Sequence, residues 1–252
     1  MKFGLGGKQF IEFSTDVEGL ERVAPVQKST HFTPQWFKEM KDYIPQQPTP
    51  DGSVPGRYGK SEETSKKWSS GTVKRCPAII DLITEGFIIP MWCDFLLQRD
   101  NQILEYDNKN FPYGIEFHNN QQIHNWKLKK GDFREGVKFN NPWRIYTPPG
   151  YSVMFIAPYY QFEQRFTVLP GIVETDSYHH INFPTIMHTK KDTIIERGTP
   201  FIQVIPFKRD DWNFDVSTMT PEQTKADRSE KLELSTKFKN SYRNITRRLS
   251  SK

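Results

Sequence analysis

Residues 141 to 209 constrain the fold of this 252-residue chain more than any other stretch. Three runs within it are rich in β-branched and aromatic residues: 151 to 156, 166 to 169 and 201 to 207. Turn-forming combinations separate these runs, namely Pro148-Pro149-Gly150, Pro170-Gly171 and Arg197-Gly198-Thr199-Pro200. Such punctuation between β-formers is typical of strands joined by turns. The stretch predicts a compact β-unit, and we expect a mainly β protein with a few helices, in the α+β class.

Aromatic residues supply an unusual share of the material for a core. They make up 14% of the chain, whereas hydrophobic residues of all kinds make up only 35% and the mean hydropathy is -0.71. Much of the length must therefore be polar surface, loop or tail. We expect a core that relies on large flat side chains, which favours a β-rich fold.

The segment before the β-unit contains signals for further elements. Pro77 and Gly86 have the character of a helix start and a helix stop, which predicts a helix over residues 77 to 85. The elements expected after it are strands over 87 to 98 and 102 to 106 and a loop over 108 to 125. His118 and His124 in that loop could bind a metal, but no Cys or carboxylate joins them at metal-site spacing, which favours solvated histidines.

Four phrases of the chain, in this order, resemble the dUTPase and dCTP-deaminase superfamily. They are Met91-Trp92-Cys93-Asp94-Phe95-Leu96, Thr147-Pro148-Pro149-Gly150-Tyr151, Gly171-Ile172-Val173-Glu174-Thr175-Asp176-Ser177-Tyr178 and Ile194-Ile195-Glu196-Arg197-Gly198-Thr199-Pro200-Phe201-Ile202-Gln203-Val204. The fold of that superfamily is the β-clip, a small distorted barrel that usually forms trimers. The resemblance implies a β-clip barrel here and a homo-oligomer, with a trimer as the implied form.

The chain departs from that superfamily where phosphate would be held. The family's triphosphate-binding Arg-Ser-Ser is replaced by Tyr159-Tyr160-Gln161, so the arginine fork and the hydroxyls are missing. The family's Gly-rich, Arg-bearing C-terminal arm is also absent from the sequence. The resemblance still places Glu174 where dUTPases have the carboxylate that activates water, and Tyr178 where they have the tyrosine beneath the sugar.

These matches define the candidate site residues. The candidate catalytic residues are Glu174 and Asp176, and the candidate substrate-binding residues are Tyr178, Tyr159, Tyr160 and Gln203. His179, His180 and His188 add imidazoles nearby, and such a set could bind a divalent metal. Adjacent histidines on an extended segment point to opposite faces, however, so we predict no metal site formed by these residues. A cofactor, Mg²⁺ or another divalent metal, is expected only if the protein is an enzyme. In the structural interpretation of the same residues, Asp176 shapes the turn and Tyr178 packs.

Most of residues 30 to 212 is also similar to an uncharacterised family found mostly in tailed phages and some bacteria. The matching phrases are Lys74-Arg75-Cys76-Pro77-Ala78, Gly86-Phe87-Ile88-Ile89-Pro90, Asn141-Pro142-Trp143, Pro148-Pro149-Gly150-Tyr151-Ser152 and Ile205-Pro206-Phe207-Lys208-Arg209. This similarity implies a viral origin and implies no activity.

Cysteine use and hydropathy indicate the compartment. The two cysteines, Cys76 and Cys93, are expected to be free thiols in a reducing cytoplasm. The first seven residues lack the apolar run of a secretory leader, and no window approaches the roughly 18 to 20 apolar residues of a membrane span. We expect a cytoplasmic protein without a membrane span, located in the host cytoplasm or in the virion if the origin is viral.

The formal charge lies almost entirely at the C-terminal end. From Pro221 onward there are nine Lys or Arg and four Asp or Glu, so this segment carries the whole formal net charge of +5. An apolar stripe at helical spacing predicts a basic amphipathic helix; its residues are Leu234, Phe238, Tyr242, Ile245 and Leu249. Nucleic acid is expected as a partner only through this helix. The helix could also lie on a membrane or dock on its own domain or a neighbouring subunit, and docking is favoured.

The predicted organisation is a Pro-rich irregular arm (residues 1 to 70), a β-clip-like domain (71 to 212) and a basic amphipathic helix (213 to 252). Two function classes fit it. The first is a non-catalytic phage-encoded binding or assembly protein, which holds a protein partner or a virion component. The second is a nucleotide-processing hydrolase of the dUTPase or deaminase type that uses Glu174. A third interpretation is a cupin-like barrel, in which histidines would converge on a metal.

Overall fold

The computed structural model describes residues 10–45, 69–100, 103–119, 121–189 and 191–236. The chain divides into two units, Met1–Arg209 and Asp210–Lys252, which are described separately. The first unit is mainly β, as predicted. In the part of the chain that the structure describes, no helix combines the length and the apolar character needed to cross a membrane.

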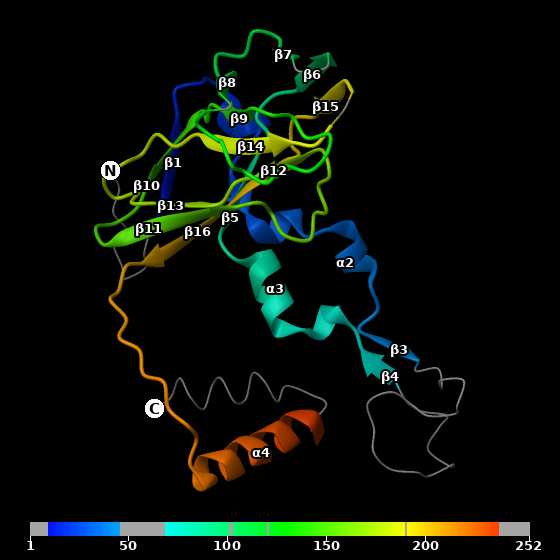
Figure 1. Cartoon of the computed structure of the whole chain (residues 1–252), viewed down its shortest axis with the longest axis vertical. Helices are drawn as coiled ribbons and strands as arrows, with labels where there is room; N and C mark the ends of the chain where they lie inside the picture. Colours follow the sequence, from blue (N-terminus) through cyan, green and yellow to red (C-terminus); the bar gives the residue numbers. More distant parts are fainter. Residues whose placement is uncertain (1–9, 46–68, 101–102, 120, 190, 237–252) are drawn as a thin grey trace. The chain divides into compact units, whose positions relative to one another are not determined.

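A five-stranded antiparallel sheet forms the centre of the first unit (Figure 1). Its strands, in spatial order, are β13 (Gly171–Val173), β11 (Tyr151–Ile156), β16 (Pro200–Lys208), β5 (Phe87–Pro90) and β2 (Gln27–Lys28). Four consecutive residues of β16, from Phe201 to Val204, are buried, so both faces of this strand are covered. Strand β16 therefore holds the centre of the sheet.

Four smaller antiparallel sheets complete the described β-structure. The four-stranded sheet consists of β12 (Phe166–Val168), β14 (Phe183–Met187), β9 (Gly136–Phe139) and β8 (Ile115–His118). The three-stranded sheet consists of β15 (Thr193–Ile195), β6 (Phe95–Asp100) and β7 (Ile103–Asp107), and the two-stranded sheets pair β1 (Glu12–Thr15) with β10 (Trp143–Tyr146) and β3 (Tyr43–Pro45) with β4 (Ser69–Gly71). Each sheet ends in two edge strands, so the described strands form no closed barrel.

The core is aromatic, as the composition predicted. The Phe201 ring is fully buried and lies 5.1 Å from Phe139 and 5.5 Å from Phe166, measured between ring centroids. Its other ring neighbours are Phe183 and Trp92, at 6.0 and 5.7 Å. Edge-to-face pairs at these separations contribute about 0.5–1.5 kcal/mol each beyond their buried area. This cluster joins the five-stranded sheet to the four-stranded sheet, and so fixes the strands that carry the candidate site.

Six helical elements lie in the described ranges. They are α1 (Leu20–Val23), α2 (Gln35–Glu39), α3 (Pro77–Thr84), α4 (Pro221–Thr236) and the 3-10 turns η1 (Ser29–Phe32) and η3 (Val73–Arg75). Helix α3 confirms the helix predicted from Pro77, and Gly86 after it adopts a φ of +68°. Among its apolar residues only Ile83 is fully buried, so α3 lies on the surface of the sheet and not within the core.

Some predicted boundaries differ from the structure. The single strand expected over 87 to 98 is divided into β5 and β6, because the chain leaves the sheet after Pro90, which has no backbone N–H to donate. Met91 between the two strands exchanges backbone hydrogen bonds with the turn after β15, at 2.8 Å to Thr199 and 2.8 Å to Gly198. The loop expected over 108 to 125 contains strand β8, which pairs with β9.

The N-terminal segment, which we expected to be an irregular arm, is part of the first unit where it is described. Its strand β1 pairs with β10 and its strand β2 forms one edge of the five-stranded sheet. Leu20 and Ala24 between them are buried in the core. Residues 46–68 lie outside the described residues.

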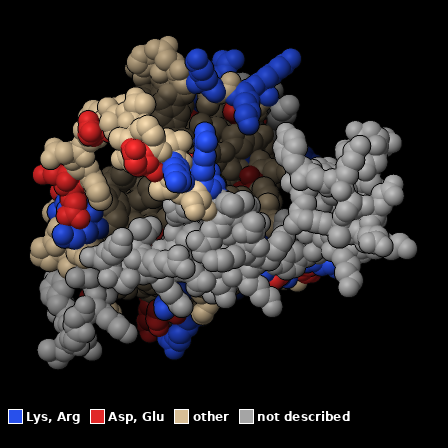
Figure 2. Space-filling model, turned by 90° about the horizontal axis from the view of Figure 1, so that it is seen from below, with Lys and Arg blue, Asp and Glu red and all other residues tan. Residues whose placement is uncertain are grey.

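In the second unit α4 lies within the segment 213 to 252, for which a helix was predicted. Thr220 and Gln223 form a capping box: Gln223 N donates to Thr220 Oγ1 (3.2 Å) and Thr220 N donates to Gln223 Oε1 (2.8 Å). Leu234 of the predicted apolar stripe lies in α4, whereas the rest of the stripe and most of the basic residues lie in 237–252, outside the described residues. Figure 2 shows that acidic and basic described side chains lie beside one another at several places on the face that it presents.

Candidate functional site

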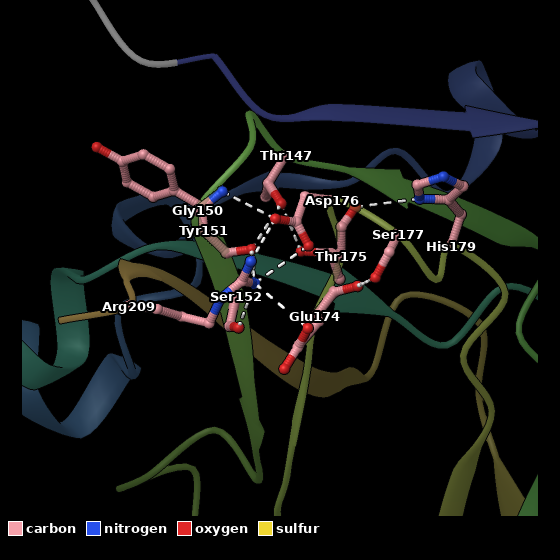
Figure 3. A network of polar contacts seen from close by, with 10 residues as sticks. All are labelled: Thr147, Gly150, Tyr151, Ser152, Glu174, Thr175, Asp176, Ser177, His179 and Arg209. Atoms are coloured by element: carbon pink, nitrogen blue, oxygen red, sulfur yellow. Dashed lines mark hydrogen bonds and ion pairs between the residues drawn. The ribbon is translucent and has the colours of Figure 1, made fainter. Parts of the chain in front are cut away.

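Two of the resemblance phrases meet at one end of the five-stranded sheet. Strand β11 pairs with β13, with Val153 opposite Val173, and with β16, with Tyr151 opposite Lys208. The turn at residues 174–178, which follows β13 and which we call the carboxylate turn, therefore lies beside the start of β11 and the end of β16 (Figure 3). Within this turn Ser177 N and Tyr178 N both donate to Glu174 O, at 3.1 and 2.9 Å.

Asp176 is the centre of a polar network. Its Oδ2 accepts a hydrogen bond from Gly150 N (2.8 Å), and the guanidinium of Arg209 spans both of its oxygens, with Nη1 3.1 Å from Oδ1 (Figure 3). The same Arg209 Nη1 lies 2.9 Å from Tyr151 O and 3.0 Å from Ser152 Oγ. The Arg209 guanidinium and the Gly150 N–H lower the pKa of Asp176 to about 2. Asp176 is therefore a charged, fully engaged carboxylate that fastens the turn to β11 and β16.

Glu174 differs from Asp176 in being open to solvent. Its side chain is 65% exposed, and its Oε2 lies 4.0 Å from Arg209 Nη1, so the pair is loose. The next residue, Thr175, is buried, and its Oγ1 lies 2.7 Å from Thr147 Oγ1. The arrangement presents one free carboxylate on a rigid turn.

The other ionisable residues near the turn do not converge on it. Tyr178 is 60% exposed, so it does not pack. His179 stacks on Tyr146 with ring centroids 4.1 Å apart, and its Nδ1 lies 3.0 Å from Thr175 O. The backbone of His180 forms an isolated antiparallel β-bridge with Arg144 of β10. His188 lies next to the connection between β8 and β9, where its Nδ1 is 2.9 Å from Asp132 Oδ1.

No metal cluster is present in the described ranges. Nowhere in them do three or more His, Cys, Asp or Glu side chains form a group that could hold a metal ion. In particular His188 and His179 are not brought together, which is what a cupin-like centre would have required. Neither cysteine is paired, and burial raises the pKa of Cys93 to about 12.

Tyr159 and Tyr160 lie at the other end of β11 from the carboxylate turn. The strand has six residues, and at a rise of about 3.3 Å per residue its ends are about 17 Å apart. Tyr160 O accepts a hydrogen bond from Trp36 Nε1 (2.8 Å). The candidate substrate-binding tyrosines and Glu174 therefore do not form one site within a single chain.

The tyrosines form part of a partly exposed aromatic cluster, which we define as Trp36, Tyr159, Tyr160 and Phe162. Trp36 lies 5.4 Å from Phe162 and 6.4 Å from Tyr160, and Tyr159 lies 6.4 Å from Tyr160, between ring centroids. Tyr159 is 55% and Phe162 66% exposed. Tyr160 and Phe162 adopt positive φ angles of 65° and 55°, which side chains of this size rarely adopt.

Gln203 is buried on β16 and faces α3. Its Nε2 donates to Leu82 O (2.7 Å) and to Glu85 O (2.9 Å), so both N–H bonds satisfy carbonyls at the end of the helix. The amide therefore holds α3 on the sheet. A ligand would have to displace the helix end to reach it.

A comparison with models of known protein families finds no match to this chain, and a comparison with curated proteins finds none either. The function must therefore be argued from the site itself.

Sequence reasoning missed two residues that organise these places, Arg209 and Trp36. Arg209 is 33 positions from Asp176, and only the register of β11 with β16 brings it to the carboxylate. Trp36 is 124 positions from Tyr160 and comes from α2, which the sequence placed in a separate arm. No local pattern in the sequence marks either contact.

Proposed function

We propose that the protein is a non-catalytic, phage-encoded binding or assembly protein on a dUTPase-like β-clip scaffold, and that its first partner is a second copy of itself. The pairing of β11 with both β13 and β16 supports the scaffold, because the Pro149 and Gly171 segments lie in neighbouring strands, as a β-clip requires. A homo-oligomer, with a trimer as the family's form, follows from the same resemblance. The host cytoplasm or the virion is its proposed location.

The aromatic cluster is the observation that carries this proposal. It stands where the resembled family holds triphosphate, yet it offers large apolar rings and no cation. Tyr and Trp are enriched in the buried centres of protein interfaces. Two aromatic residues with positive φ in one short loop are costly, at about 1–3 kcal/mol each, and such strain is typical of functional loops. We therefore infer that a protein surface covers these rings and removes them from water.

Light scattering of the full chain after size exclusion tests the assembly. We expect an oligomer that Tyr159→Ser combined with Phe162→Ser dissociates, because each covered ring contributes about 2–4 kcal/mol of association free energy. Ile172→Ser is the matched control, since Ile172 is 63% exposed on the edge strand β13 and lies outside the cluster. A chain that is monomeric at every concentration, or dissociation by Ile172→Ser alone, would overturn the role of the cluster.

The alternative is a nucleotide-processing hydrolase that uses Glu174. The exposed carboxylate 4.0 Å from Arg209 favours it, because such a group could act as the general base that activates water, with Mg²⁺ bound to the phosphates of the substrate. Deoxynucleotides with Mg²⁺ would then raise the thermal midpoint of the folded protein. We expect no shift. A shift accompanied by hydrolysis that Glu174→Gln abolishes would replace our proposal with the enzyme.

A further inference from the structure

The connection between β8 and β9 contains a hollow that is distant in sequence from the carboxylate turn and the aromatic cluster. Its volume is about 550 Å³ and it is open to solvent. It is lined by Ile123, His124, Leu128, Lys129, Lys130, Gly131, Asp132 and Arg134, and we call it the basic hollow.

Positive charge dominates this connection. Lys127, Lys129, Lys130 and Arg134 are all exposed, against the two acids Asp132 and Glu135. Among the residues that the structure describes, the side chains of Lys127, Lys130 and Arg134 make no ion pair. The Asp132 carboxylate is already engaged, with Oδ1 2.9 Å from His188 Nδ1 and Oδ2 accepting from Lys129 N at 2.8 Å. The hollow therefore offers cations that internal acids do not neutralise.

The backbone around the hollow is fixed at both ends. Ile123 and Phe133 are buried, at 7% and 2% exposure. Phe133 N donates to Met187 O (2.9 Å) in the neighbouring strand β14, and the Phe133 ring lies 6.3 Å from Phe117. Between these anchors Asp132 N donates to Lys129 O (3.1 Å) and closes a turn. The cations are therefore mounted on an ordered turn, which lowers the entropic cost of binding a ligand.

An aromatic ring accompanies the charges. Trp126 precedes Lys127 and is 42% exposed, and its backbone is held by a hydrogen bond from its N to Ile123 O (3.1 Å). An exposed indole in the same connection as unneutralised cations fits the way proteins bind single-stranded nucleic acid, in which bases stack on aromatic rings and phosphates lie along basic side chains. A duplex would offer no unstacked base to the ring.

We propose that the basic hollow and Trp126 form a binding site for single-stranded nucleic acid. The hollow accepts phosphates between Lys130 and Arg134, and Trp126 stacks on a neighbouring base. This site is independent of the proposed assembly function, because the aromatic cluster and the carboxylate turn contribute no residue to it.

Fluorescence anisotropy of a labelled mixed-sequence single-stranded DNA, titrated with the full chain at several salt concentrations, tests the site. Each lost phosphate contact lowers the slope of log Kobs against log salt by about 0.7, so Lys130→Ala with Arg134→Ala should lower it by about 1.4. Trp126→Ala should weaken binding by about 5-fold to 150-fold, the equivalent of one stacked base. A competing duplex of the same sequence should bind more weakly.

Two control variants separate the hollow from other basic parts of the chain. Lys28→Ala with Lys41→Ala removes the same charge from exposed positions elsewhere in the first unit. Arg247→Ala with Arg248→Ala removes it from the C-terminal segment, outside the described residues. We expect both pairs to reduce affinity less than the pair in the hollow, with all variants retaining the thermal midpoint of the parent. No binding by the full chain at low salt, or an equal or larger loss with either control pair, would overturn the proposal.

Discussion

Replacing Gly86 by alanine should weaken the sheet that carries the candidate site. Gly86 lies between α3 and β5 with a φ of +68°, and a Cβ placed on it would lie 2.1 Å from Val204 O and 3.0 Å from Val204 C. Both atoms belong to the backbone of β16, where Val204 is paired with Phe87 of β5. The backbone cannot rotate away as a side chain would. A methyl group at this position must therefore move β5 away from the central strand.

The magnitude follows from two separate costs. A residue with a Cβ in the left-handed region costs about 1–2 kcal/mol relative to glycine. Forcing extra volume into a well-packed place costs about 1–3 kcal/mol more. The sum, about 2–5 kcal/mol, is a large fraction of the 5–15 kcal/mol by which domains are usually stable. Gly86→Ala should therefore produce a protein with a strongly reduced free energy of unfolding.

Urea unfolding followed by tryptophan fluorescence measures the effect, with the midpoint giving the loss of stability if the slope m is unchanged. Gly198→Ala is the matched control, because Gly198 has a φ of +89° but a Cβ placed on it would meet no atom within 4 Å. Gly198→Ala should lose only the free energy that a Cβ costs in the left-handed region, about 1–2 kcal/mol. If the two variants unfold at the same urea concentration, the close approach to Val204 carries no energy and the reasoning is refuted.

Two further predictions concern ionisable groups. Arg209 and Gly150 lower the pKa of Asp176 to about 2, so the stability it contributes is present above its unfolded pKa of about 3.9 and is lost as the pH falls towards 2. Asp176→Asn should therefore flatten the decline of the thermal midpoint between about pH 4 and pH 2, and an unchanged decline would contradict this. Because partial burial raises the pKa of Cys93 to about 12, iodoacetamide at pH 8 should modify Cys93 far more slowly in the folded than in the urea-unfolded protein. Peptide mass spectrometry measures the two rates, and equal rates would contradict the raised pKa.

The strands of the central sheet were predictable because their signal is local. Residues 151 to 156 form β11 as predicted, and the runs that begin at 166 and 201 form β12 and β16 within one residue of the expected starts. Each run consists of β-branched and aromatic residues bounded by Pro or Gly, so burial and turn chemistry agree. Strand β8 lacked this signal, since its polar surroundings rich in Asn and Gln resemble a loop. Residues 115 to 118 are a strand because they pair with β9, and the local sequence does not indicate that pairing.

The candidate site was predictable only in part, for a related reason. The turn containing Glu174 and Asp176 was found because residues 171 to 178 resemble a dUTPase motif. The partner that engages Asp176 comes from the far end of β16, and the partner of Tyr160 comes from α2. Such contacts depend on strand register and on helix docking, which sequence patterns do not encode residue by residue. The same limit applies to Gln203, whose burial against α3 depends on where the helix lies.

The distribution of charge decides which part of the first unit can attract a phosphate group. At the carboxylate turn Arg209 is engaged by Asp176, which leaves the charge of Glu174 without a close partner and the group as a whole negative. A triphosphate approaching Glu174 would meet repulsion unless Mg²⁺ or a cation from another subunit compensated it. The basic hollow has the opposite sign, and its Arg134 makes no ion pair with the described residues. Single-stranded nucleic acid is therefore expected to bind beside Lys130 and Arg134, and charge removal there should weaken binding whereas Glu174→Gln should leave it unchanged or slightly stronger.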